Sequence, residues 1–131
     1  MSCKPCVLVV DDDDDLRDSL VETLQDEGYE VDAARNGKEA LDRLRDGSPH
    51  PCLILLDVMM PVMDGGTFRI NQLADPALAE IPVLVISAHA NASEKAREMR
   101  PAGFLRKPIA LTELLAATAQ HCGLPNATTA S

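Results

Sequence analysis

Residues 7–12 read VLVVDD, four consecutive apolar residues that end directly in two aspartates. A strand that is apolar at every position has both of its faces covered, as in the centre of a parallel sheet. Two further runs have the same character: residues 53–56 (LILL), which end in Asp57, and residues 83–86 (VLVI), which end in Ser87. Three buried strands, each ending in a polar residue, predict an α/β domain with a parallel sheet.

Helical stretches alternate with these strands. Leu16, Leu20 and Leu24 lie four apart on one helical stripe, with Asp14 as the predicted N-cap and Gly28 as the residue that closes the helix. The chain therefore returns from the first strand through a helix, as a crossover between parallel strands requires.

The rest of the chain continues the alternation. A capping-box pattern at Asn36 and Glu39 predicts a second helix, whereas residues 91–100 offer only a narrow apolar stripe for a fourth helix. Residues 29–33 and 104–105 are predicted as edge strands. The apolar positions of the third and last helices are Phe68 and Leu73, and Leu111, Leu114 and Leu115.

The composition limits the classes of protein to which the chain can belong. The chain has 131 residues, 46% of them hydrophobic and 25% charged, which is typical of one globular domain. Its net charge of -9 disfavours direct nucleic-acid binding, because a phosphate backbone would be repelled. No membrane span or secretory leader is predicted, so the expected location is cytoplasmic.

Four cysteines occur, Cys3, Cys6, Cys52 and Cys122. Cys3 and Cys6 have the spacing of half a zinc site or a redox pair, but no second pair at such spacing follows. We therefore predict four structural thiols, with Cys6 and Cys52 opening neighbouring strands.

Polar residues follow the predicted strands in a particular pattern. Asp11, Asp12 and Asp57 follow two of the central strands, Ser87 ends a third, and Lys107 follows the last. These groups should converge, because functional groups of open parallel sheets collect at the carboxyl ends of the strands. Three crowded carboxylates favour a hydrated Mg²⁺, and one of them can then attack a phosphorus atom in line.

Other polar residues have simpler interpretations. Asp13 and Asp15 fit a solvated charge run, and Asp64 followed by Gly65 fits a tight turn. The scattered His50, His89 and His121 predict no metal site.

The chain resembles the receiver domains of response regulators in two-component signal transduction. The segments that carry the resemblance span residues 5–122 and are VVDD (9–12), LD (56–57), MPVMDG (60–65), SA (87–88) and KP (107–108). The resemblance implies a flavodoxin-like, doubly wound, five-stranded parallel sheet with strand order 2-1-3-4-5 and five helices. We expect residues 1–124 to form this stand-alone receiver domain and residues 125–131 a short flexible tail.

The resemblance also implies roles for the acidic residues. Asp57 would be the phosphoacceptor, and Asp12 a direct ligand of Mg²⁺ or Mn²⁺. Asp11 would act partly through water, and the backbone carbonyl of Met59 would complete the metal site.

A switch is implied around the acceptor. Lys107 would pair with Asp57 and then with a phosphoryl oxygen, while the Ser87 hydroxyl would move towards another oxygen. Phe104 stands where the family more often has tyrosine, and would swing inward as Ser87 moves. The bond before Pro108 would be cis.

Met59 and His89 lie two residues beyond the implied active-site positions, where the resemblance implies that a side chain influences an attacking water. Methionine offers that water no useful hydrogen bond. We therefore expect slow loss of the phosphoryl group.

The implied partners are a sensor histidine kinase or a histidine phosphotransfer protein, and a downstream protein bound at the fourth helix, fifth strand and fifth helix. The chain would be a switch that modifies its own aspartate, not a turnover enzyme, and either a monomer or a phosphorylation-dependent dimer.

The sequence leaves three alternative functions to compare with a phosphorylated receiver. A haloacid-dehalogenase-like phosphatase needs a second acid two residues after its nucleophile, where this chain has Met59. A flavodoxin-like nucleotide binder needs a glycine-rich loop after the first strand. A degenerate receiver, used as a constitutive docking module without phosphotransfer, stays open.

Overall fold

The fold was analysed in a computed structural model that describes residues 6–46, 51–57, 65–87, 101–107 and 109–123. Within these ranges no helix has both the length and the apolar character needed to cross a membrane. The predicted fourth helix, residues 91–100, and the predicted tail, residues 125–131, lie outside the described residues.

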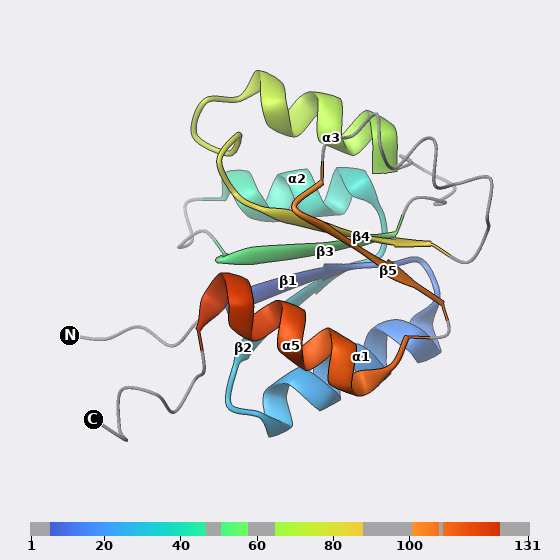
Figure 1. Ribbon diagram of the computed structural model, residues 1–131. Helices are drawn as coiled ribbons and strands as arrows, with labels where there is room; N and C mark the ends of the chain where they lie inside the picture. Colours follow the sequence, from blue (N-terminus) through green and yellow to red (C-terminus); the bar gives the residue numbers. More distant parts are fainter. Residues whose placement is uncertain (1–5, 47–50, 58–64, 88–100, 108, 124–131) are drawn as a thin grey trace.

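Five parallel strands form one sheet in the order β2-β1-β3-β4-β5, as predicted (Figure 1). The three apolar runs are the central strands, and the two edge strands are the ones expected from their sequence. The bounds are β1 Cys6–Val10, β2 Glu30–Ala34, β3 Leu53–Asp57, β4 Val83–Ser87 and β5 Gly103–Arg106.

Helices cover both faces of the sheet. Figure 1 shows α2 and α3 on one face and α1 and α5 on the other. Their bounds are α1 Asp14–Asp26, α2 Gly37–Arg45, α3 Gly65–Ala74 and α5 Leu111–Cys122. The described part of the chain is thus a three-layer, doubly wound domain.

Two hydrophobic cores follow from the alternation of side chains along the strands. Leu8 and Val10 of β1 lie in the core under α2 and α3, while Val7 and Val9 lie in the core under α1 and α5. Strand β3 divides in the same way, with Ile54 on the first side. Every residue of β3 and β4 is buried, which explains why these strands are apolar on both faces.

The cap of α1 differs from the prediction by one residue. Asp13, not Asp14, is the N-cap, and its carboxylate accepts a hydrogen bond from the backbone N–H of Leu16. Consecutive aspartates are equally good caps, so backbone geometry decides between them. Gly28 closes the helix with a φ of 98°, a conformation that favours glycine.

The capping interaction at Asn36 is confirmed. Its side-chain oxygen accepts a hydrogen bond of 2.8 Å from the backbone N–H of Glu39. The Glu39 carboxylate accepts from the N–H of Arg35, one residue before the cap itself.

The apolar faces of α3 and α5 are narrower than predicted. Phe68 and Leu114 are fully buried, but Leu73 is 46% exposed and Leu111 is 52% exposed. Both exposed leucines fit the sequence periodicity, yet they lie at helix positions that no described element covers. An apolar residue at helical spacing is therefore not always a core residue.

A polar network is buried on α3. The side-chain N–H₂ of Gln72 donates to the carbonyls of Leu78 and Ile81, each at 2.9 Å, and its oxygen accepts from Arg69 at 2.8 Å. Burial lowers the pKa of the Arg69 guanidinium. The network satisfies the backbone of the turn that leads into β4.

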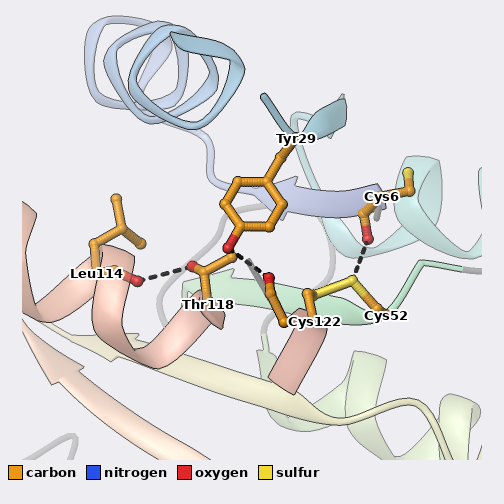
Figure 2. The surroundings of a disulfide bond; sticks show 7 residues. Cys6, Tyr29, Cys52, Leu114, Thr118 and Cys122 are labelled. Carbon is orange, nitrogen blue, oxygen red and sulfur yellow. Dashed lines mark hydrogen bonds between the residues drawn. A yellow bond between two sulfur atoms is a disulfide. The ribbon is translucent and has the colours of Figure 1, made fainter. Parts of the chain in front are cut away.

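The prediction of four thiols is wrong for two cysteines. Cys52 and Cys122 form a disulfide with a Cα–Cα distance of 5.4 Å, across 70 residues of sequence (Figure 2). Cys6, the neighbour expected for Cys52, is a free thiol, and only its carbonyl faces Cys52. The helix α5 returns its last residue to the start of β3, which the spacing of the cysteines does not reveal.

Candidate functional site

The predicted polar residues gather at the carboxyl ends of the strands. Strand pairing sets Asp57 opposite Ile86 and Ser87 opposite Arg106, so β3, β4 and β5 end at the same edge of the sheet. The backbone N–H of Lys107 continues the ladder by donating to the Ser87 carbonyl at 2.9 Å. The topology alone thus brings residues from three distant segments together.

Three carboxylates form the centre of the site. Ligand oxygens of Asp11, Asp12 and Asp57 lie within 4.8 Å of one another. Asp11 and Asp57 are buried, with 0% and 4% of their surfaces exposed, whereas Asp12 is exposed. The cluster therefore has a buried base and an open side.

Lys107 neutralises part of this negative charge. Its Nζ lies 3.4 Å from Oδ2 of Asp11 and 3.6 Å from Oδ2 of Asp57. The lysine side chain is 21% exposed and both carboxylates are nearly inaccessible, so solvent screens these pairs less than it screens a surface pair. A pairing of Lys107 with Asp57 was predicted, and the contact of Lys107 with Asp11 is an addition.

The donor set fits a hard divalent cation. Oδ1 of Asp11 accepts a hydrogen bond from the backbone N–H of Asp13, but Oδ2, although buried, accepts none from the described residues. A buried carboxylate oxygen needs a proton donor or a cation, and Lys107 is shared between Asp11 and Asp57. Oxygen ligands with an open, solvated side are the environment that Mg²⁺ prefers.

Arg17 is a residue that the sequence analysis missed. Its guanidinium donates to the Asp11 carbonyl at 3.0 Å and pairs with the Asp14 carboxylate at 2.5 Å. It thereby ties the first turn of α1 to the loop that carries Asp11 and Asp12. The signal was an arginine three residues after an acidic helix start, the spacing at which helical side chains meet.

The remaining predicted residues divide into two groups. Ser87 ends β4 and is 1% exposed, while Phe104 lies on the edge strand β5 with 38% of its surface exposed. Met59, His89 and Pro108, for which a metal-ligand carbonyl, two tuning positions and a cis bond were predicted, lie outside the described residues.

Residues 7–119 match the family model of the response regulator receiver domain. The chain belongs to the response regulator receiver family. Among similar proteins, response regulator MprA of Mycolicibacterium vanbaalenii is 39% identical over 112 residues, which cover 84% of this chain and 47% of the relative. MprA of Mycobacterium tuberculosis has the same identity and coverage. The receiver thus spans about half the length of these relatives.

Solved structures agree with this assignment. Vibrio cholerae chemotaxis protein CheY4 superposes with a TM-score of 0.82 at 30% identity, covering 91% of this chain and 99% of CheY4. A putative response regulator from Chloroflexus aurantiacus gives a TM-score of 0.83 at 30% identity, covering 92% and 98%. The flavodoxin-like strand order predicted from the resemblance is therefore confirmed.

Proposed function

We propose that this receiver accepts a phosphoryl group on Asp57, with Mg²⁺ or Mn²⁺ held by Asp11, Asp12 and Asp57 and by the backbone carbonyl of Met59. The observation that carries the proposal is the cluster of three carboxylates with Lys107 Nζ within 3.6 Å of two of them. A bound divalent metal and Lys107 would together offset the charge of the three carboxylates and would be the cations that face the phosphoryl oxygens.

Asp57 is the acceptor that the site supports. It is anchored at the end of a fully buried strand, so its carboxylate has little freedom to move. One carboxylate oxygen attacks phosphorus, and an acyl–phosphate bond forms. With a phosphohistidine donor the P–N bond breaks, its electron pair returns to the imidazole nitrogen, and that nitrogen takes a proton.

The other groups stabilise charge and orient the reactants. The metal, when bound, withdraws charge from the carboxylates and from the transferring phosphoryl oxygens. Lys107 donates to one phosphoryl oxygen after its contact with Asp57 is exchanged. Arg17 acts on no reacting atom, but it holds the backbone of Asp11 in position.

Switching would follow from the same contacts. The Ser87 hydroxyl moves to a phosphoryl oxygen, and Phe104, on the neighbouring strand, turns from its exposed position into the space beside it. The face that changes includes Phe104 and the exposed Leu111 of α5. A downstream protein would recognise this face together with the predicted helix at residues 91–100.

The proposed donor is a sensor histidine kinase or a histidine phosphotransfer protein, and the proposed location is the cytoplasm, where such kinases use ATP. The chain modifies its own aspartate and is not proposed to turn over an external substrate.

Because Met59 offers no hydrogen bond to an attacking water, the phosphoryl group should persist longer than in a Met59→Asn variant. The loss of radiolabelled phosphate from the two proteins measures this difference.

Intact-mass spectrometry with acetyl phosphate tests the central proposal. One added phosphate is expected with Mg²⁺ present, and none in EDTA or in the Asp57→Asn variant. Asp15→Asn is a matched control, since it removes the same charge from an exposed position in the first turn of α1 and should be labelled as the wild type is.

Two outcomes would contradict the proposal. A folded wild-type chain that gains no phosphate would favour the constitutive docking module instead. Labelling of the Asp57→Asn variant to the wild-type level would move the acceptor to another residue.

A further inference from the structure

We propose that Cys52 and Cys122 form a reversible redox site that is the substrate of a dithiol reductant and that holds the last turn of α5 against β3 when oxidised. The site lies at the amino-terminal edge of the sheet, at the opposite end of β3 from Asp57. It is therefore separate from the carboxylate cluster.

The covalent bond joins two elements at their ends. Cys52 directly precedes β3, and its backbone N–H donates to the Cys6 carbonyl at 2.8 Å, so the start of β3 is fixed to β1. Cys122 is the last residue of α5. The disulfide thus attaches a helix terminus to a rigid sheet.

Little else among the described residues holds this helix terminus. Thr118, one turn earlier, is fully buried, and its hydroxyl donates to the Leu114 carbonyl within the helix. Beyond it, the Tyr29 hydroxyl donates to the Gly123 carbonyl at 2.9 Å, and Figure 2 shows this bond beside the disulfide. Gln120 and Gly123 are exposed. Reduction would leave the last turn with one long-range hydrogen bond and the packing of the Cys122 side chain.

The sulfurs are placed for exchange with an external thiol. Cys52 and Cys122 are both partly exposed, so a thiolate can approach the bond without unfolding of the sheet. Cys6, the free thiol among the described residues, does not compete, because its side chain points away from the bridge in Figure 2. Burial, followed by the charges of Asp32 and Glu30, raises the pKa of Cys6 and lowers its thiolate fraction.

The chemistry is a two-electron exchange. A thiolate of the dithiol attacks one sulfur of the bond, the other sulfur leaves as a thiolate, and the second thiol of the reductant resolves the mixed disulfide. The protein gains two electrons and two protons, and the reductant becomes a disulfide. Oxidised glutathione would reverse the reaction.

The reversibility of the disulfide follows from the reducing cytoplasm in which the protein would work, and this step rests on the proposed function. A receiver supplied by an ATP-dependent kinase works in a reducing cytoplasm, where disulfides are rare and are usually transient or redox-sensing. A partly exposed bond across 70 residues would there be made and broken as the thiol pool changes.

Thiol labelling of the folded, full-length chain tests the site. Without reductant, alkylation should modify Cys3 and Cys6 only, and digestion should yield a linked Cys52–Cys122 peptide pair. Dithiothreitol under native conditions should expose all four cysteines, and oxidised glutathione should restore the pair. Labelling of Cys52 and Cys122 after treatment with oxidised glutathione, or a Cys6–Cys52 pair, would overturn the proposal.

Hydrogen exchange tests the mechanical consequence. On reduction, the amides of residues 119–123 should exchange at least tenfold faster while those of β3 and β4 stay protected, and the melting temperature should fall by about 10 °C. Cys52→Ser and Cys122→Ser should each exchange like the reduced protein, whereas Cys6→Ser, the matched control, should respond to dithiothreitol as the wild type does.

Two exchange results would contradict the inference. A bond that yields to dithiothreitol only after denaturation would be purely structural, and unchanged exchange at residues 119–123 would mean that the bond holds nothing in place. None of these readouts involves phosphate, so failure of the redox site is distinguishable from failure of phosphotransfer.

Discussion

At the scale of single residues, Lys107 is placed between two buried carboxylates. Its Nζ lies 3.4 Å from Asp11 and 3.6 Å from Asp57, so it neutralises the proposed metal ligand as well as the proposed acceptor. In the proposed function, a cation at this position would compete with Mg²⁺ for the same oxygens but would assist a phosphoryl group that brings its own negative charge.

Replacing this lysine should separate the two effects. Lys107→Met is expected to tighten Mg²⁺ binding about tenfold, because one positive charge next to the site is removed, and to slow phosphorylation by acetyl phosphate by a similar factor or more. Isothermal titration with Mg²⁺ and intact-mass kinetics measure the two quantities. Lys38→Met, at an exposed lysine paired with Asp42, is the control and should change neither. Weaker Mg²⁺ binding in Lys107→Met would show that the lysine shapes the site and does not compete in it.

Tyr29 gives a prediction about pH. Burial, followed by the charge of Glu27, raises the pKa of its phenol, and the neutral hydroxyl donates to the Gly123 carbonyl. The folded-state pKa lies above the unfolded value of about 10. The contribution of the Tyr29 hydroxyl to the free energy of unfolding is therefore complete below pH 10, and it is lost as the pH rises through the folded-state pKa.

Tyr29→Phe should therefore cost about 1 kcal/mol of unfolding free energy at pH 8, and the difference from wild type should shrink or reverse at higher pH. Urea unfolding of both proteins between pH 8 and 11 measures it. The Cys6 thiol titrates in both chains and cancels in the comparison. A difference that stays constant over this range would mean that the phenol pKa is the same in the folded and unfolded states.

The residue scale is also where sequence analysis succeeded and failed most clearly. The positions of Asp11, Asp57 and Ser87 were predictable because these residues end or directly follow strands that are apolar at every position, and parallel strands share one edge. Lys107 was placed at the same edge because it follows the edge strand β5. The bond between Cys52 and Cys122 was not predictable, because it depends on where a helix of 12 residues ends in space. Spacing along the chain carries no such information.

At the scale of elements, the edge strand β5 and the helix α5 present exposed apolar side chains on the face proposed to switch. Phe104 is 38% exposed and Leu111 is 52% exposed, although both fit apolar patterns in the sequence. Periodicity identified the elements correctly but did not distinguish a core position from an uncovered one, since that depends on neighbouring elements.

A single fluorescent reporter can follow β5, because the chain contains no tryptophan. Phe104→Trp should emit at shorter wavelength after phosphorylation with acetyl phosphate and Mg²⁺, as the ring leaves water. The same substitution combined with Asp57→Asn should show no shift, and Ile70→Trp, at an exposed position of α3 outside this face, should keep a solvent-exposed spectrum throughout. An unchanged spectrum in phosphorylated Phe104→Trp would contradict the inward movement of this side chain.

At the scale of the whole molecule, the sheet separates two candidate sites. The carboxylate cluster lies at the carboxyl edge and the disulfide at the amino edge, and β3, with Asp57 at one end and Cys52 just before the other, connects them. Five residues of extended strand span roughly 16 Å, which exceeds the distance at which energetic effects of separate sites usually couple.

The stabilities conferred by Mg²⁺ and by the disulfide should therefore add. Mg²⁺ at a hundred times its dissociation constant should stabilise the fold by about 2.7 kcal/mol, because it binds the native cluster and not the unfolded chain. This increment should be equal in the oxidised and the reduced protein to within about 0.5 kcal/mol, and absent in Asp57→Asn. Urea unfolding of the four states, with and without Mg²⁺ and dithiothreitol, measures the coupling. A larger coupling would mean that α5, which runs from the segment after Lys107 to Cys122, transmits the state of one edge to the other, and the redox site would then act on phosphorylation itself.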